Sequence, residues 1–99
     1  MFGKLGDMMG KLQEMKQKAD EIKVRLDTTI LKCESGEIKI EITGNRHIQA
    51  ITISNALQHG DQQELQEQLK SAINKAIAEA DKINEAEMKK AASGMLPGL

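Results

Sequence analysis

The sequence predicts an α+β domain with the element order helix, three-stranded antiparallel meander, helix. Apolar residues recur every three or four positions near both ends of the chain and at every second position in between. A chain of 99 residues can fill one hydrophobic core but not two. We therefore assign residues 1–93 to a single domain and expect residues 94–99 to form a mobile C-terminal tail.

The first helix is predicted over about Lys4 to Asp27 by an apolar seam with the spacing of a heptad repeat. The seam consists of Leu5, Met8, Leu12, Met15, Ala19, Ile22 and Leu26. Glycines at positions 3, 6 and 10 weaken the first turns, because an interior glycine costs up to about 1 kcal/mol relative to alanine. We expect this end of the helix to be frayed.

The meander follows the first helix. Its clearest strand is the segment 37–43, where three isoleucines alternate with charged or polar residues. The β-branched segment 28–34 precedes this strand and the segment 47–53 follows it, with turns predicted at Ser35-Gly36 and Gly44-Asn45. These three segments form an antiparallel meander.

The third strand contains an irregularity in its alternation. Ile51 and Ile53 share one face, whereas Ile48 falls on the opposite face of a regular strand. Two explanations stay open: either both faces of the sheet are partly covered, or a β-bulge lies near Ala50.

A second helix is predicted to begin at Asp61, because Asp61 and Glu64 have the spacing of a capping box. Its apolar stripe contains several alanines, which allow another backbone to approach closely. The stripe consists of Leu65, Leu69, Ala72, Ile73, Ala76, Ala80 and Ile83. The helix is expected to end near Ser93-Gly94.

The composition narrows the possible classes of protein. Hydrophobic residues make up 39% of the chain, with Phe2 as the single aromatic, so the core must be aliphatic. Such a core is thin for a monomer, and pairing two copies is a common way to bury more apolar surface. Cys33 is the only cysteine, which fits a reducing compartment. With no signal-peptide pattern and no run of about 18 apolar residues, we expect a cytoplasmic protein and no membrane partner.

The formal net charge is −1 and the pI about 6.1, so bulk charge does not indicate a nucleic-acid partner. The first helix nevertheless sorts its charges. With Leu5 at heptad position a, the charged residues at the flanking positions e and g are all basic, and the acids lie at the outer positions b and c. The flanking cations are Lys4, Lys11, Lys18 and Arg25 at g, and Lys16 and Lys23 at e.

Two interpretations of these cations stay open. A symmetric coiled coil along the whole seam would place cation against cation, so the seam should mostly meet another element. In the first interpretation, the cations are solvated or paired with acids of neighbouring elements. In the second, part of the basic edge projects beyond the core and meets phosphates.

Catalytic chemistry is not indicated. His47, His59 and Cys33 lie on different predicted elements and lack the close spacing of metal ligands. Neither a GxGxxG nor a GxxxxGK[ST] pattern occurs, so no cofactor or small-molecule substrate is expected. The absence of Trp and Tyr also disfavours stacking on single-stranded bases, so a nucleic-acid partner would be a duplex held by its backbone.

The order of these elements and several local strings resemble the YbaB/EbfC family of nucleoid-associated proteins. The strings are residues 1–4, 12–18, 38–44, 51–53, 61–76 and 94–98. The resemblance implies a homodimer joined largely through the sheets, with helices that project like the arms of tweezers. It also implies binding to duplex DNA, a cytoplasmic and nucleoid-associated location, and no cofactor.

The function predicted from the residues and the resemblance together is non-enzymatic binding of duplex DNA by a homodimer. Contacts to backbone phosphates with little sequence specificity are expected from the six flanking cations of the first helix. These are Lys4, Lys11, Lys16, Lys18, Lys23 and Arg25. The alternative is a dimeric protein–protein interaction module that does not bind DNA, which the near-neutral charge favours.

Overall fold

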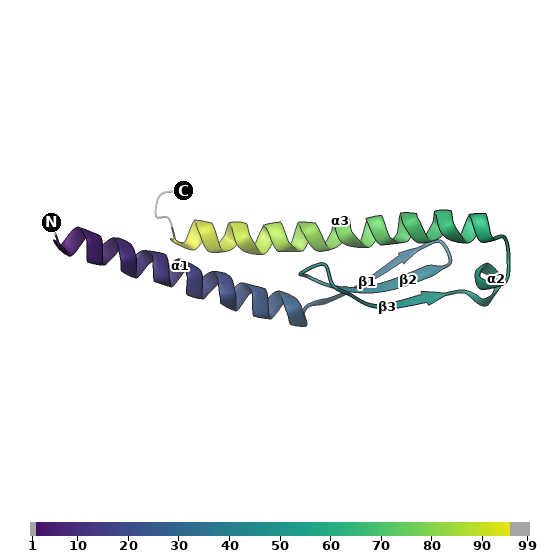
Figure 1. Cartoon of the computed structure of the whole chain (residues 1–99), viewed down its shortest axis with the longest axis horizontal. Coiled ribbons are helices and arrows are strands. Elements are labelled where there is room, and N and C mark those ends of the chain that lie inside the picture. The colour runs from purple at the N-terminus through teal and green to yellow at the C-terminus, as the bar shows by residue number, and fades with distance from the viewer. Residues whose placement is uncertain (1, 96–99) are drawn as a thin grey trace.

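The computed structural model describes residues 2–95, and the side chains of residues 6–93. It confirms the predicted order of helix, antiparallel meander and helix, and the molecule is elongated, with extents of 70 × 22 × 17 Å (Figure 1). The elements are α1 (Phe2–Thr28), β1 (Ile30–Ser35), β2 (Ile38–Thr43), β3 (Ile48–Ile53), α2 (Asn55–Gln58) and α3 (Gln62–Met95). Fraying of the first helix was expected, but α1 is continuous through Gly6 and Gly10.

The sheet has the order β1-β2-β3, and both pairs of neighbours are antiparallel. Between β2 and β3 the register shifts, so that Glu41 lies opposite Ala50 but Ile42 lies opposite Ile48. Gln49 is therefore the extra residue of a β-bulge. This confirms the bulge near Ala50 and brings Ile48 to the same face as Ile42.

The core lies between the sheet and the first half of α3. Ile38, Ile40 and Ile42 of β2 are at most 1% exposed, and Ala72 and Ala76 of α3 pack in the same cluster. Because alanine side chains are small, α3 lies close over the centre of the sheet. Burying each isoleucine contributes about 1.5–3 kcal/mol, so β2 anchors the fold.

Polar caps set where the helices begin. Asp61 caps α3 as predicted, but its carboxylate accepts a hydrogen bond from the Gln63 amide, at 2.9 Å, rather than from the Glu64 amide. The second half of the capping box is not present, because the Glu64 carboxylate accepts from Gln68 instead. The helix α3 continues to Met95, slightly beyond its predicted end, and the rest of the expected mobile tail, residues 96–99, lies outside the described residues.

The short helix α2 was not predicted. The Ser54 hydroxyl caps it by accepting from the Leu57 amide at 3.1 Å. Leu57 is 3% exposed and belongs to the core cluster, so α2 closes the end of the core between β3 and α3.

The apolar seam of α1 is packed only at its C-terminal end. Ile22 and Leu26 are buried, but Met8 and Leu12 are more than 60% exposed. The physical reason is length: α1 extends beyond the sheet, where only the second half of α3 lies beside it (Figure 1). The heptad period therefore predicted the helix correctly, but not which part of its seam would be buried.

Candidate functional site

The cations predicted to bind phosphates lie along the projecting helix α1. Lys11, Lys16 and Lys23 are exposed and Lys18 is half-buried. Within the described side chains, no carboxylate lies within 4.0 Å of any of these four ammonium groups. We call Lys11, Lys16, Lys18 and Lys23 the arm lysines. Lys4 lies in the first turn of α1, and its side chain is outside the described residues.

Arg25 differs from the arm lysines because it is paired. Its guanidinium donates a hydrogen bond to the Glu87 carboxylate of α3. Its side chain is 61% exposed, and such an exposed pair stabilises a fold by only about 0–1 kcal/mol. The pair nevertheless joins α1 to α3 at this point, so Arg25 is already engaged within the protein.

Sequence reasoning missed a second group of cations, on the half of α3 that lies beyond the sheet. Lys82, Lys89 and Lys90 are exposed, and none has a carboxylate within 4.0 Å among the described side chains. The sequence did contain the pair Lys89-Lys90, but charge patterning was considered only for the first helix. Only the length of α3 relative to the sheet shows that they stand beside α1.

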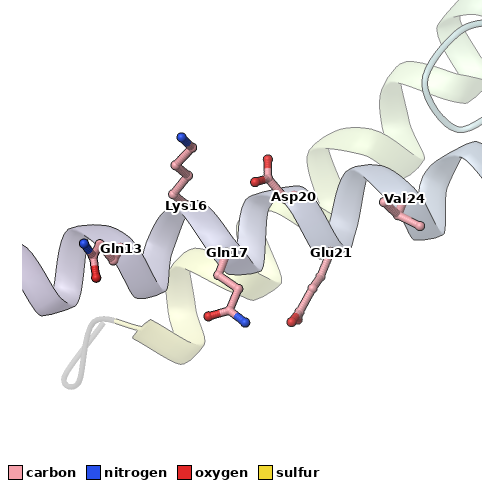
Figure 2. Close-up of a pocket in the computed structure, with 6 residues that line it drawn as sticks. All are labelled: Gln13, Lys16, Gln17, Asp20, Glu21 and Val24. Atoms are coloured by element: carbon pink, nitrogen blue, oxygen red, sulfur yellow. The ribbon is translucent and has the colours of Figure 1, made fainter.

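One side of α1 carries a shallow hollow, which Figure 2 shows. All the residues that line it come from α1 itself, so the hollow has no second wall. Lys16 and Asp20 point to one side of it, whereas Gln17 and Glu21 point to the other. Ligand sites bring a few polar groups together in a concave pocket. This surface does not, so it is not a small-molecule binding site.

The third strand presents an uncovered apolar surface. The helix α3 packs mainly on β1 and β2, so Ile48 and Ile51 of β3 remain 39% and 42% exposed. Ile51 lies opposite Ile40 and Ile48 opposite Ile42, which places both on the same face as the core. The outer edge of β3 has no neighbouring strand among residues 2–95. We call Ile48, Ile51 and this free edge the β3 surface.

Cys33 is buried under α3. Its thiol donates a hydrogen bond to the Glu79 carboxylate at 2.8 Å. Burial, and then the hydrogen bond and negative charge of Glu79, raise the pKa of Cys33 from 9.0 to about 11. The thiol is therefore protonated at neutral pH, which makes it a poor nucleophile.

We expect native Cys33 to react with iodoacetamide at pH 8 about 100-fold more slowly than in urea, because a pKa higher by about 2 leaves that much less thiolate. The folded pKa is the higher one, so the stability that the neutral thiol contributes is present below pH 9 and lost towards pH 11. In Glu79→Gln, the pKa should fall but stay above 9.0, since burial is the larger cause. Equal native and unfolded rates would contradict this account.

Two further classes of site are absent from the part of the chain that the structure describes. There, no helix is long and apolar enough to cross a membrane. Across the same residues, no three His, Cys, Asp or Glu side chains are grouped so that they could hold a metal ion. His47 and His59 are both exposed and lie on separate segments.

Comparison with known proteins gives two findings. The model of the YbaB/EbfC DNA-binding family matches residues 1–95. Among solved structures, the chain is similar to the uncharacterized protein HP0035 from Helicobacter pylori, with a TM-score of 0.69. The two are 25% identical, and the match covers 96% of each chain.

Proposed function

Because the chain belongs to the YbaB/EbfC DNA-binding family, we propose that it binds duplex DNA as a homodimer, through backbone phosphates and with little sequence specificity. The proposed role is binding rather than catalysis, and it requires no cofactor. The proposed location is the cytoplasm, in association with the nucleoid.

The observation that carries this proposal is the set of unpaired arm lysines on a helix that extends beyond the core. An ammonium group already held by a carboxylate has less to gain from a phosphate, whereas a solvated one releases counterions from the DNA when it binds. The four arm lysines have no such carboxylate within 4.0 Å among the described side chains. Lys89 and Lys90 on the neighbouring helix add two more solvated cations.

Self-association through the β3 surface would double this set. Ile48 and Ile51 are the apolar residues that the fold leaves uncovered beside its own core. A second copy packed on them would bury this apolar surface and pair the free edge of β3. Two copies of the arm lysines on one assembly raise the affinity by multivalency without any new type of contact.

A salt titration tests the DNA-binding proposal. If four to eight phosphates are neutralised by the eight arm lysines of a dimer, the logarithm of the affinity should fall with log salt with a slope of roughly −4 to −7. The measurement is a mobility-shift or fluorescence-anisotropy series on two duplexes of unrelated sequence, for which similar affinities are expected. A slope near zero, or binding to one duplex alone, would contradict the proposal.

A second candidate function is a dimeric interaction module for a protein partner. The exposure of Met8, Leu12 and Met15 along the seam favours it, because clustered exposed apolar residues mark protein-binding surfaces. If the chain were such a module, it would not change the mobility of a DNA duplex at physiological salt. The same titration therefore separates the two functions.

A further inference from the structure

The helix α1 is attached to the rest of the molecule at one end. Its buried residues, Ile22 and Leu26, lie in its last two turns, and its exposed seam residues all precede them. The arm lysines therefore stand on a segment whose direction is set by contacts near Thr28. Besides packing on α3 and the Arg25–Glu87 pair, this end makes three hydrogen bonds to the turn between β2 and β3, residues 44–46, which we call the brace turn.

The brace turn holds the C-terminal end of α1. The Gly44 amide donates to the Leu26 carbonyl oxygen at 3.0 Å. The Asn45 side-chain amide donates to the Lys23 carbonyl oxygen at 2.8 Å and to the Asp27 carboxylate. A Cβ atom at Gly44 would lie 2.7 Å from Leu26 Cδ2 and 3.2 Å from its carbonyl oxygen, so the turn approaches α1 as closely as a glycine allows.

The same turn also holds the middle of α3. The Asn84 side-chain amide donates to the Gly44 carbonyl oxygen at 3.2 Å and to Asn45 Oδ1 at 3.4 Å. The Arg46 guanidinium donates to the Asp81 carboxylate at 2.6 Å. Arg46 has a φ of 67°, a left-handed conformation that is strained for a residue other than glycine. The Asp81 carboxylate therefore binds a residue whose backbone conformation is itself fixed by the turn.

We propose that the brace turn sets the direction of α1 relative to α3, and that Asn45 is a positioning residue for the arm lysines. This inference rests on the proposed function. The phosphates of a duplex have a fixed spacing. Cations on a helix of fixed direction therefore lose less conformational freedom on binding them than cations on a helix whose direction varies. Loss of the brace should weaken binding while the number of neutralised phosphates stays the same.

The test variant is Asn45→Ala, and its matched control is Asn74→Ala, an exposed residue of α3 far from the turn. Nitroxide labels at Gln13→Cys and Ser93→Cys, in a Cys33→Ala background, report the distance between α1 and α3. Dilution with unlabelled protein restricts the measurement to distances within one chain. Thermal unfolding by circular dichroism checks that each variant is folded. If Asn45→Ala does not fold, Asn84→Ala replaces it, because this substitution removes the two hydrogen bonds from Asn84 to the turn.

We expect Asn45→Ala to broaden the distance distribution and to weaken DNA binding about three- to tenfold with an unchanged salt slope. The control should match the unsubstituted protein in both measurements. An unchanged distance distribution would overturn the inference, whatever happens to affinity. If the unsubstituted protein bound no DNA, the proposed function would fail, while the distance distribution would still decide whether the turn holds α1.

Discussion

Charge reversal of two arm lysines, Lys11→Glu with Lys18→Glu, is expected to weaken duplex binding by about 10²–10³-fold at physiological salt. The double substitution removes four phosphate contacts from a dimer and places carboxylates where cations met phosphates. The salt slope should become shallower by about 3–4, which is close to 0.9 for each lost contact. Fluorescence anisotropy across a salt series measures both quantities.

The matched control is Lys32→Glu with Lys70→Glu, which changes the net charge by the same amount. Both lysines are exposed, and they lie on β1 and on the first half of α3, away from α1. We expect this control to weaken binding by less than about tenfold, through the long-range field alone. If the control and the test variant lost equal affinity, the arm lysines would have no special role.

The largest expected effect on assembly is that of Ile48→Glu with Ile51→Glu. Both side chains are about two-fifths exposed on the β3 surface, so the free chain tolerates carboxylates there, whereas an interface between two copies would bury them without partners. The mass in light scattering is expected to fall from about twice 10.9 kDa to one chain of 10.9 kDa. DNA affinity should fall at least about 10²-fold, because the two sets of arm lysines are no longer linked.

Ile30→Glu is the control for this variant. Ile30 of β1 is 48% exposed and lies opposite Thr43. Because Ile42 lies on the core face, Thr43 and Ile30 lie on the other face of the sheet. The control should keep both the mass and the DNA affinity of the unsubstituted protein. A dimeric mass for the β3 variant would exclude this surface as the site of self-association, and a monomeric mass for the unsubstituted protein would exclude the homodimer.

The local elements could be predicted from the sequence because each has a strong period. The alternation around Ile40 indicated β2. The out-of-phase Ile48 left two explanations open, and the register shift at Glu41 shows that the β-bulge is the correct one. The helix α2 has only four residues, too few to produce a period. Its one sequence signal was Ser54 in a capping position before Leu57.

The site was harder to predict, because its properties depend on the relative lengths of elements and on long-range contacts. Nothing near Arg25 in the sequence indicates that Glu87, 62 residues away, would bind it. In the same way, Lys89 and Lys90 lie on the part of α3 beside α1 only because α3 extends beyond the sheet. The sorting of the arm lysines, in contrast, is a property of one helix, and the heptad spacing was sufficient to find it.

The helix α3 is a single rod of 34 residues whose first half packs on the sheet and whose second half carries Lys89 and Lys90. An α-helix advances about 100° per residue, so inserting or deleting one residue between Ala80 and Lys89 would rotate both lysines by that angle about the rod. The sheet packing of Ala72 and Ala76 would be unaffected. In this segment, therefore, the number of residues is fixed by helical phase, whereas residue identity matters mainly at Asp81, Asn84 and Glu87, which bind other elements.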